Sequence, residues 1–267
     1  DPCIWLDPRN RMWIFWAQGY EGHFDDRAGV WAIRTSDPES LDPEWTEPVR
    51  IADGIMMNKP TVLKNGEWLL PVAVWGGTGS SRVYVSADHG ESFEYRGEAT
   101  ITAPSERSCD EHMIIEQLDG GLRMLVRTGY GIGESTSPDS GKTWSDVNPS
   151  DIKHPVSRFF IRRLKSGNLL LVKHGPLDRQ VNRCCLKAYI SYDDGITWSG
   201  GALLDAREGV SYPDGAQQED GTIHIVYDYD RRGAKEIIEV AFTETEAADE
   251  SLTIPTERRR LINKADG

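Results

Sequence analysis

The segment Ser191–Trp198, with the sequence SYDDGITW, decides the fold because it occurs twice more in similar form. Ser137–Trp144 reads SPDSGKTW and Ser86–Phe93 reads SADHGESF, so the copies share Ser-x-Asp-x-Gly-x-x-aromatic and begin 51 and 54 residues apart. In such a turn the Asp binds backbone N–H groups, the Gly takes a positive φ and the aromatic packs between strands. The stretch from Thr35 to Trp45 resembles a degenerate further copy. These residues are expected to stabilise turns and to have no catalytic role.

A second repeat has the same period. A turn followed by an apolar strand recurs at five equivalent positions, Asn10, Gly66, Gly120, Gly167 and Gly221. The steps between them are 56, 54, 47 and 54 residues, and each copy has the pattern of a β-hairpin. A period near fifty residues with several strands per copy is typical of propeller blades. We therefore expect an all-β propeller with about five visible four-stranded blades, a single domain over 1–267, and almost no helix before about Glu244.

Composition excludes several classes of partner. The chain of 267 residues has a formal net charge of −13, so neither nucleic acid nor an anionic membrane surface is an expected partner. No apolar run is long enough for a transmembrane helix. The cysteines lack the paired short spacings of a zinc site, and no metal or other cofactor is expected. The oligomeric state is not indicated by any pattern.

Candidate functional residues follow from the blade pattern. The innermost strand of each blade lines a propeller's central channel, and these strands are expected at 56–63, 109–118, 156–164 and 210–217. Polar residues near their starts, and just past the ends of the second strands, should converge at one mouth of the channel. These residues are Asn58, Asp110, Glu111, His112, Arg127, Arg158, Arg183, Tyr212, Asp214 and Asp228.

The order of these residues resembles the sialidase (neuraminidase) superfamily of six-bladed Asp-box propellers. The segment from Val210 to Gly215 is similar to that family's Tyr-Ser-Asp strand, and Val226-Tyr227-Asp228 is similar to its Leu-Tyr-Glu strand. Glu111 and Arg127 lie 16 residues apart, which is similar to the spacing of the family's base and second arginine.

The resemblance implies a role for each residue. Tyr212 corresponds to the catalytic nucleophile and Glu111 to its catalytic partner. Arg127 and Arg183 correspond to ligands of the substrate carboxylate, and Asp228 corresponds to a supporting acid. Arginine forks bind carboxylates in a bidentate way, and a neutral phenol is a better nucleophile than a carboxylate beside an anionic sugar.

The sequence also departs from the family pattern. By blade counting, the family's first arginine and its acid/base Asp would precede Asp1, so the first blade is expected to be missing and the N-terminus to be cut. The Asp25-Asp26-Arg27 loop could supply substitutes, although it falls one blade too late. Pro213 and Asp228 stand where Ser and Glu are usual. No signal peptide is visible, although the family suggests a secreted or periplasmic protein.

The expected function is therefore that of an exo-glycoside hydrolase that removes terminal sialic acid from glycans by a retaining Tyr/Glu mechanism. One alternative is a propeller hydrolase or lyase acting on uronic-acid glycans, with His112 or His174 and Tyr212 as acid and base. Another is a non-catalytic glycan-binding propeller with sugar-stacking tryptophans at positions 5, 13, 16, 68 and 75.

Overall fold

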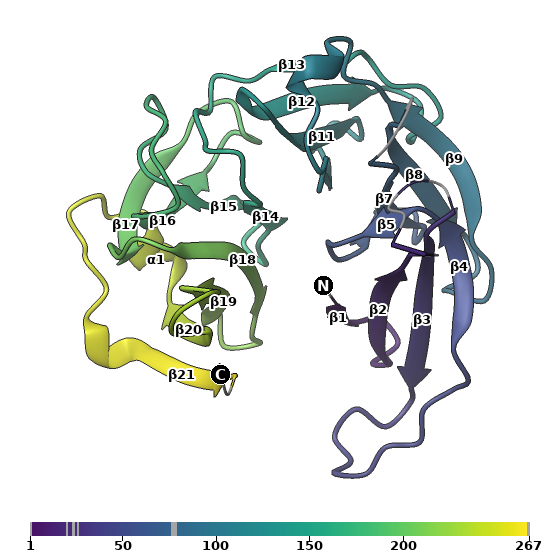
Figure 1. Ribbon diagram of the computed structural model, residues 1–267, viewed down its shortest axis with the longest axis horizontal. Helices are drawn as coiled ribbons and strands as arrows, with labels where there is room; N and C mark the ends of the chain where they lie inside the picture. The colour runs from purple at the N-terminus through teal and green to yellow at the C-terminus, as the bar shows by residue number, and fades with distance from the viewer. Residues whose placement is uncertain (1, 20, 23–24, 26, 76–78, 266–267) are drawn as a thin grey trace. The chain divides into compact units, whose positions relative to one another are not determined.

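The computed structural model describes residues 2–19, 21–22, 25, 27–75 and 79–265, which form five antiparallel β-sheets (Figure 1). Blade 1 contains β1 (Cys3–Leu6), β2 (Met12–Gln18), β3 (Gly29–Thr35) and β4 (Val49–Asp53). Blade 2 contains β5 (Ile55–Met56), β6 (Thr61–Val62), β7 (Trp68–Ala73), β8 (Ser81–Ser86) and β9 (Glu94–Ala99). Blade 3 contains β10 (Met113–Glu116), β11 (Leu122–Thr128), β12 (Gly131–Ser137) and β13 (Asn148–Pro149). Blade 4 contains β14 (Phe160–Arg163), β15 (Leu169–His174), β16 (Leu186–Ser191) and β17 (Ser199–Asp205). Blade 5 contains β18 (Val210–Gln217), β19 (Ile223–Tyr229), β20 (Glu236–Phe242) and β21 (Arg259–Lys264).

Each blade is a meander in which consecutive strands pair, and blade 2 differs only because its innermost strand is broken into β5 and β6, which both pair with β7. Helix is confined to α1 (Glu244–Ala247) and to 3₁₀ turns at Pro104–Glu106 and Thr256–Arg258 within the described residues. No helix among them is long and apolar enough to cross a membrane. The prediction of five blades with almost no helix before Glu244 is confirmed.

The chain divides into two compact units. Unit 1 comprises residues 1–128 and 133–148, which include blades 1 and 2 and most of blade 3. Unit 2 comprises residues 129–132 and 149–267, which include blades 4 and 5. The single domain expected over 1–267 stays a prediction.

The five repeated turns have one geometry, which explains their period. Their corner residues, Asn10, Gly66, Gly120, Gly167 and Gly221, have φ values of 58°, 89°, 90°, 91° and 91°. In every copy the corner N–H donates to the carbonyl three residues earlier, at 2.9 to 3.1 Å. Left-handed backbone is accessible to glycine and tolerated by asparagine, so each blade carries such a residue where the first hairpin turns back.

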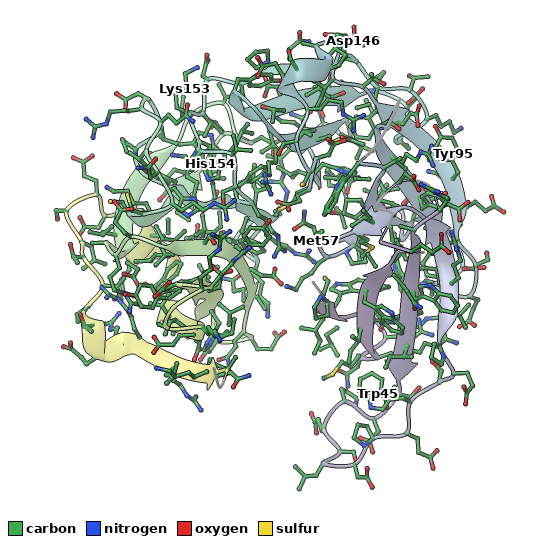
Figure 2. All side chains as sticks on the ribbon, in the orientation of Figure 1. Trp45, Met57, Tyr95, Asp146, Lys153 and His154 are labelled. Atoms are coloured by element: carbon green, nitrogen blue, oxygen red, sulfur yellow. The ribbon has the colours of Figure 1, made fainter. Side chains whose placement is uncertain are left out.

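The Asp-box turns form the hydrogen bonds that their sequence predicts. In the first copy the Ser86 hydroxyl accepts the Gly90 N–H at 2.7 Å, and Asp88 accepts the N–H groups of Glu91 and Ser92 at 3.0 and 2.9 Å. The degenerate copy keeps only part of this pattern. Thr35 accepts the N–H of Asp37, whereas Trp45 is exposed on the loop between β3 and β4 instead of packing between strands (Figure 2).

Three tryptophans of blades 1 and 2 pack together in a hydrophobic cluster of unit 1. The rings of Trp5 and Trp68 pack edge to face with centroids 4.8 Å apart, and Trp13 packs against Trp68 at 5.9 Å. All three side chains are at most 5% exposed. They fill blades, so these three are not available as the sugar-stacking surface of a glycan-binding module.

Candidate functional site

Glu111 lies just before β10 in a backbone conformation that its surroundings must enforce. Its φ is +40°, and such left-handed backbone costs a non-glycine residue on the order of 1–3 kcal/mol. The buried Asn58 amide donates to the carbonyls of Glu111 and His112 at 2.8 and 2.9 Å. These two bonds fix the two successive backbone carbonyls that follow the Glu111 Cα atom. Strain of this kind clusters at functional sites.

The Glu111 carboxylate forms a buried ion pair with Arg127 at the end of β11. The distance from Oε2 to Nη1 is 2.7 Å, and the two side chains are 1% and 8% exposed. The Arg127 backbone N–H also donates to the Asp110 carbonyl at 2.7 Å, so main chain and side chain both join β11 to the segment before β10. The structure thus brings together two of the residues that the sequence predicts at the site.

Asp110, the residue before Glu111, is held by two side chains of unit 1. It is fully buried, and it accepts hydrogen bonds from Arg107 at 2.7 Å and from Ser81 at 3.1 Å. Burial raises the pKa of this carboxyl, while Arg107 opposes the shift. Because Asp110 is not accessible to a substrate, its role is to position the backbone next to Glu111.

Two histidines that the sequence makes candidates for acid/base work are buried instead. His112 is 1% exposed and its Nε2 bonds to the Arg82 carbonyl at 2.8 Å, while burial lowers its pKa to about 4. His174 is fully buried between the Val210 carbonyl, at 2.9 Å, and the His154 ring, at 3.1 Å (His154 is labelled in Figure 2). Burial likewise lowers the pKa of His174 to about 4. Both imidazoles are already bonded to backbone carbonyls, and His174 holds the start of β18.

Tyr212 lies at an irregular point of β18 in unit 2. Ser211 pairs with Asp228 and Asp214 pairs with Val226, so β18 contains one extra residue between these pairs. Such a β-bulge redirects the side chains that it contains. Tyr212 has a φ of +56° and is partly exposed. The bulge therefore presents a strained tyrosine at the first residues of an inner strand.

Charged side chains surround the Tyr212 ring, and we call Tyr212, Arg183, Arg231, Asp228 and Ser211 the Tyr212 cluster. The guanidinium carbons of Arg231 and Arg183 lie 3.8 and 5.6 Å from the ring centroid. Asp228 accepts a hydrogen bond from the Ser211 hydroxyl at 2.6 Å and pairs with Arg231. The three residues predicted here, Arg183, Tyr212 and Asp228, are thus brought together.

Arg231 and Ser211 were not predicted from the sequence. Arg231 comes three residues after Asp228, past the end of β19, which is a region where the blade pattern places site residues. Arg158 and Asp214, which were predicted, form a mostly buried pair in which Arg158 Nη2 lies 3.6 Å from Asp214 Oδ1. The predicted hydrogen bond between Glu111 and Tyr212 joins residues of different units and stays a prediction.

The Asp25-Asp26-Arg27 loop is described only in part, because Asp26 lies outside the described residues. Asp25 pairs with Arg27, with its Oδ2 2.5 Å from Nη2. Within the described part of the chain, no group of three or more His, Cys, Asp or Glu residues has the arrangement of a metal site.

Comparisons with known proteins agree with this architecture. The model of the BNR repeat-like domain family matches residues 1–225. The anhydrosialidase of Macrobdella decora is 31% identical over 126 residues, which are 47% of this chain and 16% of that protein. Among solved structures, the Hadza microbial sialidase Hz136 has a TM-score of 0.69 at 18% identity, covering 85% of this chain and 50% of that one. A polysaccharide lyase of family PL25, an ulvan lyase, has a TM-score of 0.51 at 11% identity, covering 98% and 69%.

The chain therefore spans half or less of the length of both sialidase relatives. The likeness to the solved structures shows the fold, and it confirms the prediction of a sialidase-like β-propeller.

Proposed function

The chain belongs to the BNR repeat-like domain family, and from this premise we propose that it is a sialidase-like exo-glycoside hydrolase. Its substrate is a glycan that ends in sialic acid. Tyr212 is the nucleophile and Glu111 is the base that activates it. Arg127 and Arg183 bind the substrate carboxylate, and Asp228 orders Arg231 beside Tyr212.

The observation that carries this proposal is the environment of Tyr212. A tyrosine in a left-handed bulge, partly exposed, with guanidinium carbons 3.8 and 5.6 Å from its ring, is costly to hold without a functional reason. Cations stabilise the anionic form of a phenol, and they attract an anionic sugar. Both effects favour a phenol that attacks a carboxylate-bearing anomeric carbon.

The proposed reaction has two steps. In the first, the Tyr212 oxygen forms a bond to the anomeric carbon, the glycosidic C–O bond breaks, and Glu111 accepts the phenolic proton. A general acid protonates the departing oxygen, for which Asp25 and Asp26 are the first candidates. In the second, water attacks the anomeric carbon and gives its proton to the same acid/base group, while the bond from the anomeric carbon to the Tyr212 oxygen breaks and Glu111 returns the proton to that oxygen. Retention of configuration follows from the two displacements.

The activity test uses an aryl sialoside, because its good leaving group needs little protonation. We expect the chain to hydrolyse 4-methylumbelliferyl N-acetylneuraminide, and Tyr212→Phe to lose at least about 100-fold in kcat. Tyr192→Phe is the matched control, since Tyr192 lies in the same unit on an Asp-box turn and is 59% exposed. Equal rates for Tyr212→Phe and the parent chain would refute the assignment of the nucleophile.

A uronic-acid glycan is the second candidate substrate. The PL25 ulvan lyase has the same fold, and a uronate carboxylate needs the same arginines. In this case Tyr212 is the base that removes the proton α to the carboxylate, since His112 and His174 are bonded to backbone carbonyls. Formation of an unsaturated uronate from ulvan, together with no release of sialic acid from any sialoside, would favour this function.

A further inference from the structure

We propose that Arg231 binds the carboxylate of the substrate together with Arg183, and that Asp228 and Ser211 hold Arg231 in place for this role. The proposal rests on the proposed function, and it adds a binding residue that the repeat pattern does not identify. All of the residues involved belong to unit 2.

The Arg231 guanidinium is fixed at one edge and open at the other. Its Nε donates to Asp228 Oδ2, and Asp228 is itself held by the Ser211 hydroxyl at 2.6 Å on Oδ1. The bond from Nε to Asp228 is the one hydrogen bond that the Arg231 guanidinium makes within the described part of the chain. The side chain remains 42% exposed. Both terminal nitrogens are therefore available to a carboxylate, which guanidinium forks bind through two parallel hydrogen bonds.

The charges of the Tyr212 cluster also call for an anion. Two guanidinium groups lie beside one phenol, and Asp228 is the only acid in the cluster. Arg183 is anchored by one hydrogen bond from Nη2 to the Val156 carbonyl, at 3.0 Å. The cluster thus has a positive balance in a chain whose formal net charge is −13. A bound carboxylate would neutralise this excess.

A purely structural role for Arg231 explains the geometry less well. The turn that follows β19 is already held by Asp230, which accepts the N–H groups of Gly233 and Ala234 at 3.0 and 2.8 Å. The turn therefore does not need the Arg231 side chain. An exposed ion pair such as Arg231–Asp228 stabilises a protein by only about 0–1 kcal/mol.

A second stacked arginine, in the same unit, shows the geometry of a structural one. Arg207 lies 3.8 Å from the Tyr229 ring, the same separation as Arg231 from Tyr212. Its Nε and Nη2 both bind the buried Asp205, at 3.0 and 2.6 Å. Asp205 also accepts the hydroxyl of Tyr227 at 2.9 Å. Arg207 thus uses its fork on a protein carboxylate, whereas Arg231 leaves its fork open.

The test compares acid and ester forms of one ligand by calorimetry. The probe is 2-deoxy-2,3-didehydro-N-acetylneuraminic acid, and its methyl ester lacks the charge. Arg231→Gln should weaken binding of the acid on the order of 10- to 100-fold and leave the ester unchanged, because only the acid offers two charged acceptors. Arg231→Lys should fall between, since it keeps the charge and loses the fork. Arg232→Gln is the matched control: it removes the same charge from the next exposed residue, and it should change neither affinity by more than about twofold.

The outcomes separate this inference from the proposed function. If Arg231→Gln binds the acid as tightly as the parent chain, Arg231 serves Asp228 alone and the inference is wrong, even where Tyr212-dependent hydrolysis is found. If sialosides are not cleaved but glucuronic acid binds in an Arg231-dependent way, the inference stands and the sialidase function fails. If neither the didehydro sialic acid nor glucuronic acid binds to the parent chain, the inference is overturned. Unchanged circular dichroism and melting temperature of each variant exclude misfolding as the cause.

Discussion

The buried ion pair between Glu111 and Arg127 allows a stability prediction of large size. Arg127→Met leaves the Glu111 carboxylate, whose side chain is 1% exposed, without its cation. Removal of one partner of a buried pair costs about 3–5 kcal/mol, because the remaining charge is desolvated and uncompensated. For a chain of this size, about 1 kcal/mol shifts the melting temperature by about 2–4 °C. The expected decrease is therefore about 6–20 °C.

The assay is thermal unfolding followed by circular dichroism, on a double-mutant cycle. Glu111→Gln with Arg127→Met removes both charges, so it should be more stable than Arg127→Met alone. Arg123→Met is the control, because Arg123 lies on the same strand and pairs with Glu134, whose side chain is 35% exposed. Such a solvent-screened pair should contribute no more than about 1 kcal/mol.

Two results would refute this reasoning. Arg127→Met could lose no more stability than Arg123→Met, in which case the Glu111 charge is not effectively buried. Alternatively, the double variant could be as unstable as Arg127→Met, so that the lost stability comes from packing and not from the charge.

Three further predictions concern pH and turn chemistry. The pKa of His174 is about 4 in the folded chain and about 6.5 in the unfolded chain, so between these pH values the unfolded chain binds the extra proton. The free energy of unfolding should therefore fall by on the order of 3 kcal/mol as pH drops from 6.5 to 4. His174→Gln should flatten this pH dependence in urea titrations, and an unchanged slope would contradict the prediction. Hydrogen bonds from Thr143 lower the pKa of Asp139 to about 2, so this carboxylate stabilises the fold above about pH 4 and stops doing so as pH falls towards 2; Asp139→Asn should therefore be less stable than the parent chain at pH 6 and equal to it near pH 2. Gly167→Ala should lower the free energy of unfolding by about 1–2 kcal/mol, because φ is +91°, and the cost should come from the backbone alone, because no atom lies within 4 Å of the added methyl group. A neutral effect would mean that the turn relaxes.

The sequence predicts the fold well because its signals are local. A corner such as Gly167 or Gly221 and a box such as Ser86–Phe93 need only their own hydrogen bonds, so they can be recognised without the rest of the molecule. The predicted inner strands begin too early in blades 3 and 4, where the ladder starts at Met113 and Phe160. In blade 3, the residues just before Met113 bond to Asn58, Arg107 and Arg127.

The site is predicted less completely because it depends on non-local geometry. The register shift at Tyr212 and the stacking of Arg231 on its ring depend on the pairing of β18 with β19, which no short pattern encodes. The burial of His112 and His174 is likewise a consequence of blade packing. The expectations for Glu111, Arg127, Arg183 and Asp228 rested on spacing along equivalent strands. Because the blades repeat, residues at equivalent sequence positions lie at equivalent places in their blades within each unit.

Covalent trapping tests the central claim, that Tyr212 is the nucleophile, most directly. A 2,3-difluoro sialic acid has a fluoride leaving group that needs no acid, and its second fluorine slows hydrolysis of the glycosyl-enzyme. Attack by Tyr212 forms the O–C bond, breaks the C–F bond and releases fluoride, while the phenolic proton goes to the base. Intact-mass and peptide-mapping mass spectrometry should find one sialosyl group, on the peptide that contains Tyr212, and none in Tyr212→Phe. An adduct on another residue, or the same labelling in Tyr212→Phe, would contradict the account.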